Sequence, residues 1–341
     1  MSKPTTKITR SAGGLRCAAV SDVGMRRASN QDSLAISLAS DDRDWRSRGH
    51  LFVVADGMGA HAAGELASQL ATDNIPHAYQ KRRDLPPCES IIAAVHEANA
   101  KINAKGQNSV DFHGMGTTCS CLLLLPDGAM AAHVGDSRVY RLRGHTIEQL
   151  TFDHSLVWEM AAAGHASEDD VPAYVPKNVI TRSLGPNPIV KVDLEGPLPI
   201  RAGDRFLLCS DGLTGPLNPQ LIGMILASLP PEDAAQTLVD LANLLGGPDN
   251  ITVVAARFEG DGLPEPNGTD GIGHQAYHPA QTTTVPDLTP IATDEPASHE
   301  LRIDTSDEAT SGYAPLVDRI RSLALVLIIL GVLLLLLMVW Q

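Results

Sequence analysis

The chain has 341 residues, of which 43% are hydrophobic and 19% charged, and its formal net charge at neutral pH is −14. A chain of this length and composition can form a folded domain of about 250 residues with additional segments, which excludes disorder throughout. The negative charge disfavours a nucleic-acid partner, because binding a phosphate backbone needs a basic stripe and the longest basic run is KRR at residues 81–83.

The expected elements follow from apolar runs in chain order. Short, often β-branched runs bounded by turn residues predict strands, and longer runs with helical spacing predict helices. Strands are expected at 51–55, 118–125, 130–134, 138–142, 205–210 and 251–258, and helices at about 64–81, 89–104, 154–163, 218–228 and 231–245. The strands come in groups with paired helices between them, so we expect antiparallel sheets with helices packed outside, an α+β layered domain.

The composition divides the chain into four parts. Residues 1–13 are polar, lack the apolar region of a signal peptide, and are expected to be an N-terminal extension. Residues 14–259 carry the predicted elements. Residues 260–314 are rich in proline and acidic residues without sustained periodicity, which predicts a flexible linker because too little apolar surface is available to offset ordering. Residues 315–341 form the fourth part.

The fourth part contains the strongest membrane signal. Residues 323–340, LALVLIILGVLLLLLMVW, carry no charge. As a helix they would reach roughly 27 Å, close to the hydrocarbon core of about 30 Å. Arg319 and Arg321 precede them, so the positive-inside tendency keeps the large N-terminal part on the cytoplasmic side. We expect a single transmembrane helix; the alternative is a buried helix that is apolar all round.

The cysteines are expected to be reduced core residues, because they form no zinc-type arrangement and three lie in apolar runs. They are Cys17, Cys88, Cys119, Cys121 and Cys209. Cys119 and Cys121 would share one face of a strand, so a redox or metal role for this pair is the alternative.

Aspartates recur where apolar strands end. Asp56, Asp136 and Asp211 follow predicted strands, and Asp249 precedes the last one. Any single aspartate next to glycine is a common turn. Four carboxylates at one edge of a sheet would repel one another, and a hard divalent cation such as Mg²⁺ or Mn²⁺ would offset this repulsion. Two such ions, about 3.5–4 Å apart, activate a water for attack on phosphorus.

These aspartates belong to motifs through which residues 14–259 resemble the metal-dependent serine/threonine phosphatases of the protein phosphatase 2C type, particularly bacterial members. The motifs are SDVGMRRASNQDS (21–33), VVADGMGAHAAGE (53–65), GMGTTCSCLLL (114–124), AHVGDSRVYRLR (132–143), LTFDHSLVWEMAAAG (150–164), NVITRSLG (178–185), LLCSDGLTG (207–215) and GPDNITVVAARF (247–258). The resemblance implies a β-sandwich of two antiparallel sheets flanked by helical layers, with metals in a cleft at one end.

The resemblance also implies a set of metal ligands. Asp56 would bridge two ions and Gly57 would lend its carbonyl oxygen. Asp211 and Asp249 would complete the first site. Asp136, together with Asp211, resembles the ligands of a third, weaker ion.

The first two motifs suggest the other site residues. Arg27 matches the family's phosphate-binding arginine, whose guanidinium would hold two phosphate oxygens. Gln31 stands where many members carry a glutamate, which leaves Asp32 to help hold the second ion through water or neighbouring bonds. Met58 stands where many animal members carry a histidine. His61, five residues after Asp56, resembles the bacterial pattern and is our candidate for a general acid or for a group that supports the metal ligands, with a helix-start histidine bonded to backbone as the alternative.

The resemblance predicts an enzyme that hydrolyses phosphoserine and phosphothreonine with metal-bound hydroxide, without a phosphoenzyme. Its partners would be phosphoproteins and a bacterial Ser/Thr kinase that it opposes. Residues 164–182 correspond to the variable flap of bacterial members. We expect the catalytic domain in the cytoplasm and the C-terminal anchor in the inner membrane. The alternatives are a catalytically weak phosphoprotein scaffold near a membrane complex and, against the charge, a metal-dependent nuclease.

Overall fold

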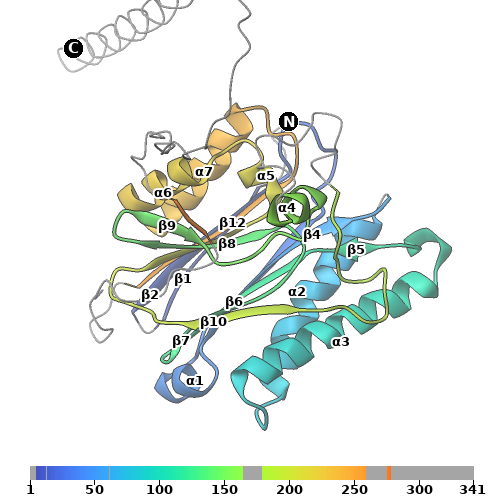
Figure 1. Cartoon of the computed structure of the whole chain (residues 1–341), viewed down its shortest axis with the longest axis horizontal. Helices are drawn as coiled ribbons and strands as arrows, with labels where there is room; N and C mark the ends of the chain where they lie inside the picture. The colour runs from blue at the N-terminus through green and yellow to red at the C-terminus, as the bar shows by residue number, and fades with distance from the viewer. Residues whose placement is uncertain (1–4, 13, 61, 164–178, 259–274, 278–341) are drawn as a thin grey trace, which may run out of the picture. The chain divides into compact units, whose positions relative to one another are not determined.

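The computed structural model describes residues 5–12, 14–60, 62–163, 179–258 and 275–277. Two antiparallel sheets lie face to face in this part of the chain, with helices outside them (Figure 1), which confirms the predicted α+β sandwich. The expected transmembrane segment 323–340, residues 164–178 of the expected flap, and His61 lie outside the described residues. Among the described helices, none combines the length and apolar character needed to cross a membrane.

Each sheet has a simple antiparallel order within the described residues. The first runs β1 (Thr5–Ala12), β2 (Leu15–Asp22), β12 (Ile251–Phe258), β11 (Arg205–Cys209), β8 (Arg138–Arg143), β9 (Thr146–Gln149) and β13 (Gln275–Tyr277). The second runs β10 (Asp193–Leu198), β7 (Gly128–Val134), β6 (Cys119–Leu125), β4 (His50–Met58) and β3 (Asp32–Ser37), with β5 (Gly116–Thr117) paired to β4.

The long helices cover the outer faces of the two sheets (Figure 1). On the second sheet lie α2 (Ala63–Lys81) and α3 (Pro87–Gln107), and on the first lie α6 (Pro219–Ser228) and α7 (Pro231–Leu244). The shorter helices are α1 (Asp42–Ser47), α4 (Leu156–Ala162), α5 (Asp211–Thr214) and a 3-10 turn at Val110–Phe112. Each of these four long helices begins within two residues of its predicted start.

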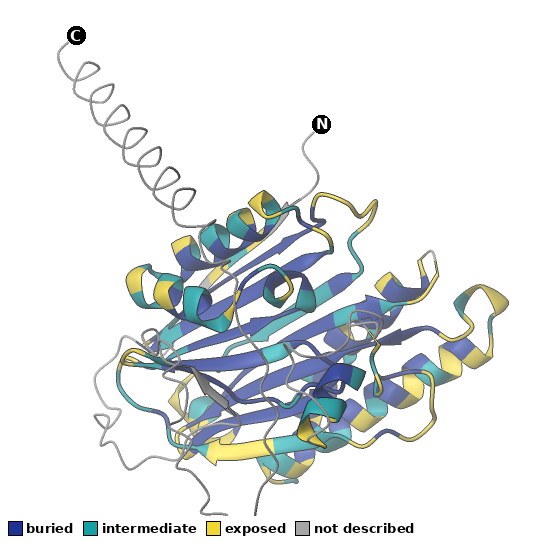
Figure 2. Ribbon diagram, turned by 45° about the horizontal axis from the view of Figure 1, so that its top comes forward, coloured by how far each residue is buried: buried dark blue, intermediate teal, exposed yellow. Residues whose placement is uncertain are grey.

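The strands at the centre of the sandwich are buried on both faces, which explains their continuous apolar sequences. In β4, Phe52 and Val54 point into the core between the sheets, whereas Leu51, Val53 and Ala55 point into the core beneath α2 and α3. The central strands of both sheets are buried, the edge strand β10 is half-buried to exposed, and the long helices expose their outer faces (Figure 2). Strand ends therefore emerge at a rigid edge, where polar residues can be held in place.

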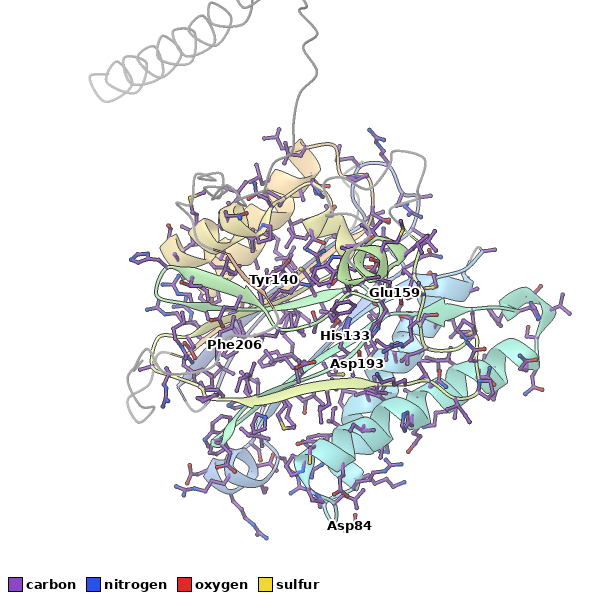
Figure 3. All side chains as sticks on the ribbon, in the orientation of Figure 1. Asp84, His133, Tyr140, Glu159, Asp193 and Phe206 are labelled. Atoms are coloured by element: carbon purple, nitrogen blue, oxygen red, sulfur yellow. The ribbon has the colours of Figure 1, made fainter. Side chains whose placement is uncertain are left out.

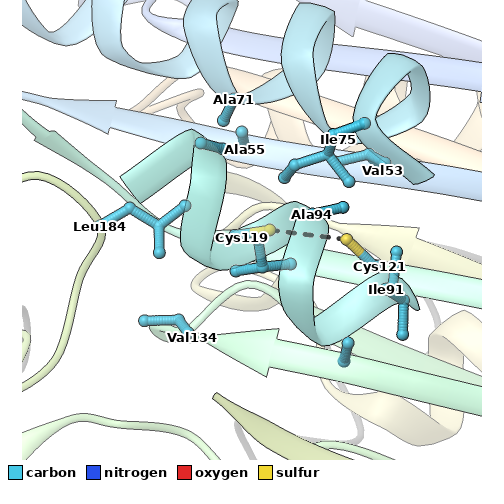
Figure 4. Close-up of a cluster of buried hydrophobic side chains, with 14 of the residues drawn as sticks. Val53, Ala55, Ala71, Ile75, Ile91, Ala94, Cys119, Cys121, Val134 and Leu184 are labelled. Atoms are coloured by element: carbon cyan, nitrogen blue, oxygen red, sulfur yellow. Dashed lines mark hydrogen bonds between the residues drawn. The ribbon is translucent and has the colours of Figure 1, made fainter. Parts of the chain in front are cut away.

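The cysteine pair is part of the core. Cys119 and Cys121 are fully buried beneath α2 and α3, with their Sγ atoms 3.5 Å apart (Figure 4). All five cysteines are free thiols. The hydrogen bond with Cys119, and after it burial, raise the pKa of the Cys121 thiol well above its usual value. This environment supports the core interpretation.

The N-terminal extension differs from the expectation. Residues 1–13 were placed before the domain, but β1 occupies most of this segment and pairs with β2 along its whole length. Its sequence, TTKITRSA, is largely polar. Ile8 in this strand is partly buried and packs against the core between the sheets. An edge strand of this kind has no apolar run, so its pairing depends on the neighbouring strand rather than on a local signal.

Candidate metal and phosphate site

The acidic residues gather where β3, β4, β11 and β12 end. Asp32, the first residue of β3, is the direct cross-strand partner of Asp56 near the end of β4. Asp211 follows β11 and begins α5, while Asp249 lies just before β12, the strand that pairs with β11. The sandwich thus brings four carboxylates from distant parts of the sequence to one edge.

Asp136 approaches the same cluster from the turn between β7 and β8. Its carboxylate is 7% exposed and interacts electrostatically with Asp211. Asp56 in turn feels the charges of Asp32, Asp211, Asp136 and Asp249. All five predicted acidic ligands therefore belong to one interacting group.

Burial and mutual repulsion raise the pKa values of Asp32, Asp56, Asp136 and Asp211. Burial is the main cause for Asp32, whose pKa rises to about 7 although a hydrogen bond from Ser210 opposes the shift. Burial and then the charge of Asp211 raise the pKa of Asp136 to about 8. Burial, followed by Asp32, raises the pKa of Asp56 well above its usual value. Holding these groups ionised requires nearby positive charge.

The donor chemistry fits a hard divalent cation. Among the described residues, one buried carboxylate oxygen in each of Asp32, Asp136 and Asp211 has no hydrogen-bond partner. Buried oxygens of this kind are costly unless something positive or a donor faces them. In the part of the chain that the structure describes, no three acidic, histidine or cysteine side chains are already drawn together at ligand distance. The site is thus a cluster of available oxygen donors rather than a closed coordination shell, and it suits Mg²⁺ or Mn²⁺.

Gly57 allows the end of β4 to lie directly against the start of α2. A Cβ atom at Gly57 would lie 2.1 Å from the carbonyl oxygen of Gly64 and 2.6 Å from that of Gln31. The Gly57 amide donates to the Gln31 carbonyl at 3.1 Å. No side chain fits here, so the glycine keeps the backbone of the predicted ligand next to the acids.

Arg27 lies beside the acidic cluster on the loop between β2 and β3. Its Nη2 donates to Asp249 Oδ2 at 2.6 Å, and half of its side chain is exposed. The charge of Arg27 also lowers the pKa of Asp211, against the larger effects of burial and Asp249. The guanidinium is therefore near the acids and accessible to an anion.

Asn250 holds the Arg27 loop in place, a role that the sequence analysis missed. This buried amide donates to the carbonyls of Val23 and Ser29, both at 2.9 Å, and accepts from the Gln31 amide at 2.8 Å. Its position next to Asp249 in the GPDN motif was the available signal. One side chain thereby fixes both ends of the loop.

Hydroxyl groups hold the ligand-bearing strand ends. Ser210 Oγ donates to Asp32 Oδ2 at 2.7 Å. Thr118 Oγ1 accepts from the Asp56 amide at 2.8 Å and lies 2.7 Å from Ser137 Oγ. The ends of β4 and of the turn that carries Asp136 are thus joined through Thr118 and Ser137. These hydroxyls were also missed, because nothing local in the sequence marks them.

The predicted site residues therefore meet, with the exception of His61, whose position is not described. Asp32, Asp56, Gly57, Asp136, Asp211, Asp249 and Arg27 lie in one region, as the bonds and charges above establish. His61 lies outside the described residues, so its role stays a prediction. Cys209 is fully buried, and burial raises the pKa of its thiol to about 12, which agrees with a core residue rather than a nucleophile.

Comparisons with known proteins give a consistent family assignment. A family model described as protein phosphatase 2C matches residues 25–249. The protein phosphatase PhpP of Streptococcus pneumoniae is 36% identical over 246 residues, covering 69% of this chain and 94% of that protein. The crystal structure of the Mycobacterium tuberculosis serine/threonine phosphatase PstP/Ppp matches with a TM-score of 0.62 and 36% identity, covering 72% of this chain and 99% of that chain.

A second crystal structure bears on the metal. The catalytic domain of PstP in complex with two manganese ions matches at 36% identity and a TM-score of 0.59, covering 71% of this chain and 97% of that chain. A relative therefore binds the ions that the donor set described above would accept.

Proposed function

This chain belongs to the protein phosphatase 2C family, so it is a metal-dependent serine/threonine protein phosphatase, and we propose that it works at a membrane against a Ser/Thr protein kinase. The group of five interacting aspartates beside Arg27 is the observation that carries the metal-dependent phosphatase activity. The membrane and kinase parts of the proposal rest on the apolar residues 323–340 and on the family. Such a group of carboxylates is unfavourable for stability, and divalent cations would offset its charge and attract an anionic phosphate.

We assign the metal-holding roles as follows. Asp56 would bridge two ions with the Gly57 carbonyl beside it, Asp211 and Asp249 would complete the first site, and Asp136 with Asp211 would hold a third, weaker ion. Asp32 would support the second site, with Gln31 next to it contributing an uncharged amide. The cations would supply an activated water and neutralise charge on the phosphate.

Arg27 is proposed to bind the phosphate of the substrate. Its bond to Asp249 joins side chains that are 50% and 29% exposed, and an ion pair of this kind contributes little stability. The guanidinium can therefore exchange Asp249 for two phosphate oxygens at low cost. Its planar fork matches those oxygens and stabilises charge that develops during the reaction.

His61 is retained as the proposed proton donor to the leaving serine or threonine oxygen. Met58, at the end of β4, has no ionisable group and cannot serve. His61 follows Asp56 by five residues, so it is close in sequence to one of the clustered aspartates. The general acid must reach the leaving oxygen within hydrogen-bond distance, directly or through one water.

We further propose the division of the chain around this site. The phosphatase domain would occupy residues 14–259 together with strands β1 and β13, which pair with β2 and β9. The rest of residues 260–314 would be a flexible linker, and residues 315–341 would carry a single helix at about 323–340 in the inner membrane. A random coil of a few tens of residues spans a few tens of ångströms, so the cytoplasmic domain would search a shell near the membrane surface. The substrates would be membrane-associated phosphoproteins and the kinase itself.

Phosphate release from a phosphothreonine peptide tests the enzyme. The full chain in detergent is assayed with Mn²⁺, with a chelator, and as the Asp211→Asn variant, with Asp240→Asn on the exposed face of α7 as the matched control. We expect release that needs Mn²⁺, is lost in Asp211→Asn and is retained in Asp240→Asn. Phosphopeptide binding without release would favour the scaffold alternative, and cleavage of DNA instead would favour a nuclease.

The tether needs a separate test. Membrane fractionation of the full chain is compared with that of a chain lacking residues 323–340. The phosphothreonine content of proteins in the membrane fraction is measured in the same cells. We expect the full chain in the membrane fraction and the shortened chain outside it, with higher phosphorylation of membrane proteins in cells that carry the shortened chain. Equal distribution of the two chains would overturn the tether.

A further inference from the structure

Two buried histidines hold the turn that presents Asp136. The carbonyl oxygen of Gly135 accepts from the His154 amide at 2.7 Å and from His133 Nε2 at 2.8 Å. The Gly135 amide donates to His154 Nδ1 at 2.9 Å. Gly135 has a φ of +115°, and a Cβ atom there would lie 2.6 Å from Thr118, so the turn has little room to move. Both polar backbone groups next to Asp136 are thus bound to imidazole-bearing residues.

The bond to Gly135 determines which nitrogen of His154 carries the proton. Nδ1 accepts, so in the neutral ring Nε2 is the donor, and it lies 2.9 Å from Asp193 Oδ2. Burial lowers the pKa of His154, which keeps the ring neutral at neutral pH. Arg182 Nη1 donates to the other oxygen, Asp193 Oδ1, at 2.9 Å and also lies 2.9 Å from His154 Nε2. The guanidinium therefore fixes the carboxylate, and the carboxylate fixes the ring.

His133 supports the same ring from the neighbouring strand. The two imidazole centroids are 5.0 Å apart with an interplanar angle of 31°. His133 is the direct cross-strand partner of Asp193 in the pairing of β7 with β10, and the two lie close together between the layers (Figure 3). Burial lowers the pKa of His133 to about 3, so it too is neutral. The ring of His154 is thus confined by Gly135, Asp193 and His133 together.

We infer that His154 is a positioning residue for Asp136: with Asp193 and Arg182 orienting it, its Nδ1 fixes the Gly135 turn so that the Asp136 carboxylate faces the weakest of the bound ions. The inference rests on the proposed role of Asp136 as a ligand of that ion. A buried polar network is expensive unless every member is satisfied, and apolar residues of similar volume would pack this space more cheaply. The network binds Gly135, the residue that directly precedes the proposed ligand Asp136. Hydrogen-bonded groups behind a metal ligand commonly orient that ligand in this way.

Two substitutions of His154 separate positioning from simple packing. In His154→Asn the side-chain oxygen can take the place of Nδ1 and accept from the Gly135 amide, while the reach to Asp193 is lost. In His154→Gln the longer amide takes the place of Nε2 and reaches Asp193, while the acceptor for Gly135 is lost. Arg182→Gln keeps His154 and Asp193 and removes the charge that contacts both of them, from a side chain that is 27% exposed.

The test is a Mn²⁺ titration of the full chain in detergent. Binding is monitored by calorimetry and by the electron spin resonance signal of free Mn²⁺, and phosphopeptide hydrolysis is measured in parallel. We expect His154→Gln to weaken the lowest-affinity Mn²⁺ site about tenfold or more, and the tighter sites to stay within twofold. His154→Asn should keep the lowest-affinity site near its wild-type strength. Arg182→Gln should weaken it by a few fold.

A buried ion pair far from the turn supplies the control. Arg143 and Asp204 are joined at 2.7 Å, and Asp204 is 1% exposed. Asp204→Asn should lower thermal stability without changing any Mn²⁺ affinity. Unchanged weak-site affinity in folded His154→Gln, or equal losses in His154→Asn and His154→Gln, would overturn the inference. If the wild type binds Mn²⁺ but releases no phosphate, the proposed function fails while the titration still decides the role of His154.

Discussion

Asp32 and Asp56 are direct cross-strand partners in the antiparallel pairing of β3 with β4. Like charges directly opposite each other destabilise a sheet, and this pair is buried as well. Burial is the main cause of the raised pKa of both carboxyl groups, and the charge of Asp32 adds to the rise at Asp56. Because the sheet imposes the pairing, the protein cannot relieve the repulsion by moving one side chain away, and a bound cation would do so. Metal binding and fold stability are therefore coupled at this strand pair.

Asp56→Asn should separate stability from activity. Removing one buried charge while keeping the shape should stabilise the metal-free protein by about 1 kcal/mol and abolish both phosphate release and the stabilisation that Mn²⁺ brings. Thermal unfolding with chelator and with Mn²⁺ measures both effects. Asp240→Asn, on the exposed face of α7, should change neither. A metal-free Asp56→Asn protein that is less stable than the wild type would contradict the repulsion argument.

Arg27 substitutions should affect catalysis and leave stability nearly unchanged. The bond between Arg27 and Asp249 is half-exposed, so Arg27→Ala should alter the free energy of unfolding by less than about 1 kcal/mol. Loss of the phosphate-binding fork should lower kcat/KM for a phosphopeptide by about 100-fold. Arg27→Lys keeps the charge without the fork and should recover only part of that loss. Steady-state kinetics and urea unfolding test this, and full activity of Arg27→Lys would argue against two-oxygen binding.

Asn250→Ala should disrupt both the fold and the site. The substitution removes three hydrogen bonds that hold the loop bearing Arg27 and leaves two carbonyls and one amide without this partner. We expect about 3 kcal/mol lower stability and a raised KM, because the loop is then free to shift. Asn243→Ala is the matched control, since Asn243 makes one bond of 3.1 Å to Asp22. Urea unfolding and phosphopeptide kinetics give the readouts; similar losses in both variants would show that the Asn250 bonds carry no special role.

The elements that the sequence predicted are those whose signal is local. The last strand was expected at 251–258, and β12 covers those residues because Val253 and Val254 point into two different cores. The strands that were missed include the buried strand β2 and the strands β1, β3, β9 and β10. The residues of β3 and β10 are mostly half-buried or exposed, so the strand character of these two depends on pairing with β4 and β7 rather than on an apolar run.

The site divides in the same way. Asp56, Asp136, Asp211 and Asp249 could be found because each stands beside an apolar run, whereas Asp32 came from the family resemblance. The groups that hold them could not be found in this way. Asn250 bonds to a carbonyl 227 residues earlier in the chain, and His133 donates to Gly135 from inside β7. Such partnerships arise from tertiary proximity, which no local pattern encodes.

His50 should make the stability of the fold depend on pH. It is the first residue of β4, whereas Asp56 lies near the end of the same strand. Its ring is 2% exposed, accepts from the Ala39 amide at 3.0 Å through Nδ1, and stacks on Trp45 with centroids 4.7 Å apart. Burial lowers its pKa from 6.5 to about 4, against a smaller opposing effect of Asp44. Protonation would also remove the acceptor that Ala39 uses.

The depressed pKa gives the sign of this effect. The unfolded chain binds the proton near pH 6.5 and the folded protein near pH 4, so the stabilisation by neutral His50 is complete above pH 6.5 and is lost as the pH falls toward 4. The loss should amount to about 3 kcal/mol. His50→Asn keeps an acceptor for Ala39 without a titrating group, so its deficit relative to the wild type at pH 7 should shrink as the pH falls. Urea unfolding of both proteins between pH 7 and pH 4 measures this, and a difference that stays constant over that range would show that His50 does not titrate as the burial of its ring requires.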